Sequence, residues 1–199
     1  MGSQRFRRLA SATIALFALA VFGAPASAQS TWQAFLTGAQ ETGAPNGSLG
    51  TGYAFMSLTG NLLSIHIEFS GLTGLTTASH IHCCAGPGVS AAVATQTPSF
   101  IGFPLGVTSG TFDNTYDLTL ATSYRAGFIT DNGGTTASAM AVLISGMNSG
   151  NAYVNIHTLT SPGGEIRGQI IATPEPSTVV LMTAGLLGVM VATMRRRQS

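Results

Sequence analysis

The chain contains no lysine, and charged residues of all kinds make up only 8% of its 199 residues. All eight basic residues are arginines, and six of them lie close to the two ends. Between residues 29 and 172, two arginines stand against six carboxylates, which gives this segment a formal charge of −4. We therefore expect neither nucleic acid nor an anionic lipid surface as a partner.

Cysteine is also scarce, since Cys83 and Cys84 are the two copies in the chain and they are adjacent. Residues 29–172 are enough for one domain with a buried core and no disulfide framework. The segment has no nucleophile elbow, phosphate-binding loop, paired zinc-ligand spacing or calcium loop. The sequence therefore predicts no catalytic residue and a protein that is not an enzyme.

The N-terminus has the three parts of a secretory signal peptide. A basic stretch with Arg5, Arg7 and Arg8 precedes an apolar run, and small residues follow up to Ala28. This pattern predicts recognition by the Sec translocon and cleavage of residues 1–28 by signal peptidase after Ala28. A retained membrane anchor is the alternative, but the apolar run is short for a membrane span.

The other end of the chain predicts a membrane helix. An uncharged run, 179–194, precedes Arg195, Arg196 and Arg197. As a helix this run would reach about 24 Å, slightly less than a hydrocarbon core of about 30 Å. The arginine cluster would stay on the cytoplasmic side. Residues 173–199 should therefore anchor the protein transiently in the inner membrane, with its body on the far side.

Pro174, Glu175 and Pro176 stand just before this run. The prolines keep the segment from being helical, which leaves it accessible to a protease. The Pro-Glu-Pro motif, the single span and the basic end together resemble the PEP-CTERM sorting signal of Gram-negative bacteria. The resemblance implies that an exosortase-type enzyme cleaves near the motif and passes the protein to the cell surface or the exopolysaccharide matrix. A plain C-terminal anchor is the alternative, and both imply export.

Short segments with strand periodicity and frequent turn signals fill the middle of the chain. Residues 52–72 have the pattern of a hairpin that turns at Gly60 and Asn61. One helix is predicted over 136–150, where apolar residues recur at helical spacing. The strand pattern of 151–158 follows it. These features predict a mainly β fold, a β-sandwich or Greek-key barrel with one short helix.

Three stretches of the middle segment carry a second resemblance. They read FLTGAQETGAPNGSLGTG at 35–52, ASHIHCCAGPGV at 78–89 and GNAYVNIHTLTSPGGEIRGQI at 150–170. In this order they resemble the CHRD domain, which is named from chordin and occurs in bacterial exported proteins. The resemblance implies an immunoglobulin-like sandwich without established enzymatic activity, and the adjacent cysteines depart from the family pattern.

Three of the four histidines lie in these motifs. Strand alternation places His80 and His82 on one face of their strand, and it turns His157 outward together with Tyr153 and Asn155. Imidazoles are preferred ligands of zinc and copper. One hypothesis is therefore a copper or zinc site built from the three histidines. The alternative is that they bond to backbone and turn groups and hold the motif strands together.

The cysteines leave three states open. Export places Cys83 and Cys84 in an oxidising compartment. They could form a disulfide with each other, stay as thiols or supply a further ligand to a metal held by the histidines, or bridge two molecules.

The sequence as a whole predicts an exported, non-enzymatic protein of the cell surface or the exopolysaccharide matrix. Its three parts are a signal peptide (1–28), a CHRD domain (29–172) and a sorting signal (173–199). The domain would act as a binding or adhesion module for envelope or exopolysaccharide components, without a cofactor. The alternative is a copper- or zinc-binding redox or metal-handling protein that uses the three motif histidines.

Overall fold

The computed structural model describes residues 30–42, 47–173, 183–190 and 193–194. The predicted processing sites at Ala28 and at 174–176, and the arginine cluster at 195–197, lie outside these ranges. Within the described part of the chain, no helix is both long and apolar enough to cross a membrane. The predicted span is described in part, as helical backbone at 183–190 and 193–194, and it stays a prediction.

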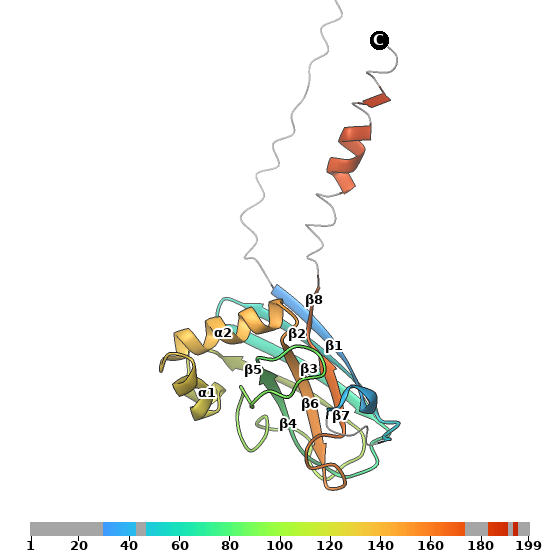
Figure 1. The fold of residues 1–199 in the computed structure, drawn as a ribbon, viewed down its shortest axis with the longest axis vertical. Coiled ribbons are helices and arrows are strands. Elements are labelled where there is room, and N and C mark those ends of the chain that lie inside the picture. The colour runs from blue at the N-terminus through green and yellow to red at the C-terminus, as the bar shows by residue number, and fades with distance from the viewer. Residues whose placement is uncertain (1–29, 43–46, 174–182, 191–192, 195–199) are drawn as a thin grey trace, which may run out of the picture.

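Eight described strands form one antiparallel sheet that curls around the core (Figure 1). They are β1 (Ser30–Thr37), β2 (Thr51–Thr59), β3 (Leu62–Ser70), β4 (Thr76–Cys83), β5 (Gly110–Asp117), β6 (Ala152–Thr158), β7 (Ile166–Gln169) and β8 (Ile171–Thr173). The order across the sheet is β4-β6-β7-β1-β2-β3-β5, and β8 pairs with β1. The predicted mainly β class is confirmed, although the strands pair continuously in one curled sheet, without the break between two paired sheets that a sandwich implies.

The predicted hairpin is confirmed. β2 and β3 pair along their full length, from Thr59 opposite Leu62 at the turn to Thr51 opposite Ser70. Gly60 has a φ of +61°, in the left-handed region that glycine reaches without a steric penalty. The turn therefore sets the register that separates the buried and exposed faces of β3.

Two helices lie together on one side of the sheet (Figure 1). α2 (Thr136–Asn148) confirms the predicted helix, and it begins at a capping box in which Thr135 and Ser138 bond to each other's backbone N–H. α1 (Ala126–Asp131) was not predicted, because six residues are too few to show a helical period. Two short 3-10 turns, η1 (Gly38–Gln40) and η2 (Ala121–Ser123), complete the described helices of the domain.

The core lies inside the curl of the sheet. Trp32, Ala34 and Leu36 alternate along β1 and have no exposed surface. The Nε1 of Trp32 donates to Asn148 Oδ1 at 3.0 Å, so this buried ring also satisfies its polar atom at the end of α2. Burial of a large apolar side chain of this kind contributes about 1.5–3 kcal/mol relative to exposure.

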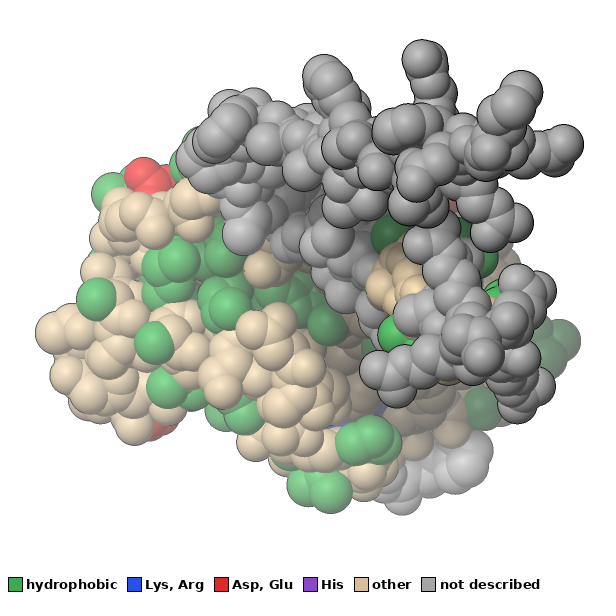
Figure 2. Space-filling model, turned by 90° about the horizontal axis from the view of Figure 1, so that it is seen from above, with side chains coloured by type: hydrophobic (Ala, Val, Ile, Leu, Met, Phe, Trp, Pro, Cys, Tyr) green, Lys and Arg blue, Asp and Glu red, His purple; other side chains and the backbone are tan. Residues whose placement is uncertain are grey.

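The surface agrees with the low charge of the sequence. Seen from above, it shows mainly hydrophobic and uncharged polar side chains with few charged ones among the described residues (Figure 2).

A long connection covers the second face of β4, β6 and β7. We call residues 85–105 the cover segment. Its backbone bonds to the edge of β4, for example from Ala94 N to Ile81 O at 2.9 Å and from Phe100 N to Ser79 O at 3.0 Å. This face is therefore buried. The prediction that Tyr153 faces outward is right about the face of the strand but wrong about exposure, because its side chain is 4% exposed.

Candidate metal centre

The three predicted histidines meet beneath the cover segment. β4 presents His80 and His82 on one face, and the neighbouring strand β6 presents His157 on the same face. One ring nitrogen from each histidine lies within 4.8 Å of the corresponding atoms of the other two. The fourth histidine, His66, lies on β3 and is not part of this cluster.

Each of the three imidazoles has one nitrogen bonded to a backbone carbonyl. A carbonyl oxygen only accepts hydrogen bonds, so the ring nitrogen facing it must carry the proton. In a neutral ring the other nitrogen then keeps a free lone pair. The bonds run from His80 Nε2 to Pro98 O at 2.7 Å, from His82 Nδ1 to Ala91 O at 2.9 Å and from His157 Nδ1 to Pro162 O at 2.8 Å.

The remaining nitrogens face one another without a donor between them. His80 Nδ1 lies 3.3 Å from His157 Nε2. His82 Nε2 is buried and has no hydrogen-bond partner. Two lone pairs at this separation repel each other, and an unpartnered buried nitrogen costs about 1–3 kcal/mol. A water molecule that donates to these nitrogens, a proton or a metal ion would relieve the arrangement.

The surroundings oppose a proton. Burial lowers the pKa of His80 to about 4 and that of His82 to about 4, and the His157 ring nearby lowers both further. Burial also lowers the pKa of His157 below its usual value. Burial therefore favours the neutral ring at all three positions, the form in which histidine binds metals.

A stack of side chains holds His82 in place. Its ring lies parallel to Tyr153, with ring centroids 4.7 Å apart, and the guanidinium carbon of Arg167 lies 3.4 Å from the centroid of the Tyr153 ring. Arg167 also donates to Val89 O in the cover segment at 2.9 Å. Sequence reasoning did not find this supporting role. Strand alternation was the signal that could have found Tyr153. It lies two residues before Asn155 and four before His157, so all three side chains share one face of β6.

The cysteines lie away from the histidine cluster. Cys83 follows His82 on β4, so its side chain points to the opposite face, toward α2. A Cβ atom on Gly146 of α2 would lie 2.4 Å from Cys83 Sγ, so this contact has room only for glycine. The sulfurs of Cys83 and Cys84 face each other, and the disulfide between them stays a prediction. Among the described residues, the group that could hold a metal ion contains three histidines and neither cysteine.

Glu165 ties neighbouring parts of the fold together. Its fully buried carboxylate accepts from the hydroxyls of Ser48 and Thr158, each at 2.6 Å, and from the backbone N–H groups of Thr73 and Gly74 at 2.5 and 3.0 Å. Burial raises the pKa of this carboxyl, but the four donors outweigh that effect and lower the pKa to about 2. The site's second strand, β6, is thereby joined to the connection before β4.

The chain matches two family models. The CHRD domain matches residues 32–170, and the PEP-CTERM protein-sorting motif matches residues 172–197. A comparison with curated proteins finds no match, and neither does one with solved structures. The sorting motif implies recognition by an exosortase and export to the envelope or beyond. The CHRD match covers more than half of the chain. The chain therefore belongs to the CHRD domain family, and it carries a PEP-CTERM sorting motif.

Proposed function

We propose that this exported CHRD domain holds one copper or zinc ion between His80, His82 and His157. The observation that carries the proposal is the convergence of three unprotonated ring nitrogens, each fixed by a carbonyl bond on the other side of its ring. Histidines that bind metals usually donate their second N–H to a carbonyl or carboxylate in this way, which sets both the tautomer and the ring orientation.

The donor set favours copper or zinc. Three imidazoles suit these ions, whereas calcium and magnesium require oxygen ligands. Ligand nitrogens about 2.0–2.1 Å from a tetrahedral ion are roughly 3.3 Å from each other. His80 Nδ1 and His157 Nε2 already have this separation, at 3.3 Å. His82 needs a small side-chain movement to join them, since the largest separation within the cluster is under 4.8 Å.

Three protein ligands leave a fourth position for water or for an exogenous ligand. His157 is partly exposed, so this position has a route to solvent. Such a site supports storage or transfer of the ion, and electron transfer when the ion is copper. The binding or adhesion role that the family resemblance implies stays a separate prediction, and so does the absence of enzymatic activity.

Metal analysis tests the proposal. We expect the full chain, purified in mild detergent without a polyhistidine tag and dialysed against zinc or copper, to retain about one ion per molecule. A variant with both His80→Ala and His82→Ala should retain almost none. His157→Gln, at a partly exposed position, should lose the ion as well and gives a second variant if the double variant is unstable.

His66→Ala is the matched control. His66 is the remaining histidine, and it bonds to Asp113 at 2.8 Å on the outer face of the sheet. Its replacement should leave the metal content unchanged. Wild-type protein with well under one ion per molecule, or equal losses in His66→Ala and the double variant, would contradict the proposal.

A further inference from the structure

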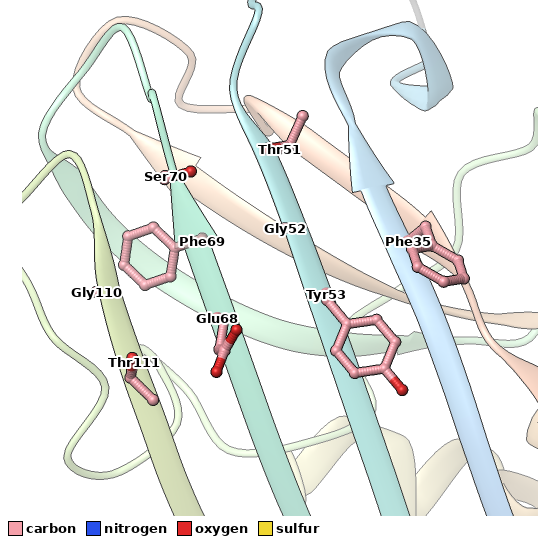
Figure 3. A pocket seen from close by; sticks show the side chains of 9 residues that line it. All are labelled: Phe35, Thr51, Gly52, Tyr53, Glu68, Phe69, Ser70, Gly110 and Thr111. Atoms are coloured by element: carbon pink, nitrogen blue, oxygen red, sulfur yellow. The ribbon is translucent and has the colours of Figure 1, made fainter.

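The outer face of β1, β2, β3 and β5 is open and differs from the histidine site. Residues that point away from the core line up across these strands in rows. One row runs Phe35, Tyr53, Glu68, Thr111. In Figure 3 the rings of Phe35 and Tyr53 lie side by side on adjacent strands, with the Glu68 carboxylate beside them on the next. The ring centroids of Phe35 and Tyr53 are 5.2 Å apart.

A second row continues the same mixture of groups. It runs Gln33, Phe55, His66, Asp113. His66 is held between two carboxylates, with Nδ1 2.8 Å from Asp113 Oδ1 and Nε2 3.3 Å from Glu68 Oε1. A third row consists of serines and threonines. The face thus combines aromatic rings with fixed hydrogen-bonding groups.

The aromatic rings lie where burial would be the usual outcome. Phe35 is 60% exposed and Phe55 is 38% exposed, although both lie in the middle of paired strands. Exposed aromatic groups clustered on one face and bordered by polar residues commonly mark a binding surface. Tyr and Phe rings also lose little conformational entropy on binding, because they have two side-chain torsions.

Two shallow cavities follow one another on this face. The first, of about 620 Å³, is lined by Phe35, Tyr53 and Glu68 among others, and the second, of about 380 Å³, is lined by Phe55, His66 and Asp113 among others. Since the two linings occupy adjacent rows of the same strands, the hollow is long rather than round. An extended ligand that runs along the strands, over both cavities, fits this shape better than a compact one.

Charge limits what such a ligand can be. The three outward-facing rows contain the carboxylates of Glu68 and Asp113 and no arginine. A polyanion or an anionic membrane would be repelled here. A second copy of this face would bring like charges together. A peptide cannot add a strand within this face, since both edges of β2 and of β3 are already paired.

We propose that the outer face of β1, β2, β3 and β5 binds an uncharged polysaccharide chain. The exposed rings offer apolar surface to the C–H faces of sugar rings, and the carboxylates, His66 and the hydroxyl row bond to sugar hydroxyls. The exported location places this surface where such polymers occur. The proposal does not depend on the metal centre, which lies on β4 and β6.

Affinity electrophoresis of the full chain tests the proposal. The probes are five neutral polymers (hydroxyethyl cellulose, amylose, mannan, xylan and galactan), with alginate and phosphatidylglycerol vesicles as anionic comparisons. We expect retardation by at least one neutral polymer and by neither anionic probe. The double variant Phe35→Ser, Tyr53→Ser should lose at least about tenfold in affinity, the effect of removing aromatic anchors.

Leu159→Ser is the matched control, because Leu159 is 66% exposed but follows β6, away from this face. It should bind as the wild type does. The variants replace exposed or partly exposed side chains, and unchanged circular dichroism and melting temperature would show that they are folded. Absence of binding to all five neutral polymers, stronger binding to either anionic probe, or full affinity in the double variant would overturn the proposal.

Discussion

Zinc supplied at about 100 times its dissociation constant should raise the melting temperature of the full chain by roughly 5–10 °C. An ion that binds the folded state alone at this excess adds about 2.7 kcal/mol to the free energy of unfolding. For a domain of this size, 1 kcal/mol corresponds to roughly 2–4 °C. Relief of the facing lone pairs of His80 and His157 contributes to the affinity and is therefore already contained in this figure.

The histidine variants separate this effect from nonspecific binding. His157→Gln should melt at the same temperature with and without zinc, whereas His66→Ala should show the full rise. Differential scanning calorimetry with a zinc titration measures both. An equal rise in His157→Gln would show that zinc binds elsewhere and would contradict the proposed centre.

Glu165→Gln should lower the free energy of unfolding on the order of 3 kcal/mol at pH 7. The wild-type carboxylate accepts hydrogen bonds from four N–H and O–H groups of described residues. The glutamine amide would place its own N–H₂ group against some of these donors, and those hydrogen bonds would be lost. Because the pKa of Glu165 is lowered from 4.5 to about 2 in the folded protein, its contribution is complete above about pH 5. It is lost as the pH falls from there toward 2.

Urea unfolding across this pH range tests the prediction. Wild-type stability should fall toward pH 2 more steeply than that of Glu165→Gln, so the two should converge in acid. Glu68→Gln is the matched control, since Glu68 lies on the exposed outer face, and it should differ little from the wild type. A wild-type stability that is flat between pH 5 and 2, or an equal loss in Glu68→Gln, would refute the role assigned to Glu165.

Local patterns predicted much of the fold. The alternating pattern of residues 52–72 and the turn residues Gly60 and Asn61 predicted the hairpin of β2 and β3. These signals are readable because each depends on residues a few positions apart. The helical spacing of α2 belongs to the same class.

Features that depend on distant contacts were not predictable in the same way. The cover segment, 85–105, has no strand or helix period, and its position comes from bonds to β4 that no local pattern encodes. The burial of Tyr153 and Asn155 follows from that position. A sandwich of two sheets was expected from short strands with frequent turn signals and from the CHRD resemblance, whereas the actual pairing order joins β4, β6, β7 and β1 in one curl.

The candidate site likewise combines features that local spacing predicted with features that depend on distant contacts. Spacing alone placed His80 and His82 on one face, and the hypothesis of a shared site added His157. The distances among the three histidine rings could not be predicted, because they depend on the pairing of β4 with β6, two strands far apart in the sequence. The alternative hypothesis, that the histidines bond to backbone and turn groups, is confirmed by their three carbonyl bonds. Which carbonyls accept was not predictable, since they lie in the cover segment and after β6, and they orient the other nitrogens toward one point.

The most direct test of the metal centre is nuclear magnetic resonance of the four histidine rings in full-length chain labelled with ¹⁵N, before and after zinc. Without zinc, the carbonyl bonds predict a proton on Nε2 of His80 and on Nδ1 of His82 and His157. One equivalent of zinc should shift His80 Nδ1, His82 Nε2 and His157 Nε2 and leave His66 unchanged. A different tautomer at any of the three rings, or a zinc-dependent shift confined to His66, would contradict the account.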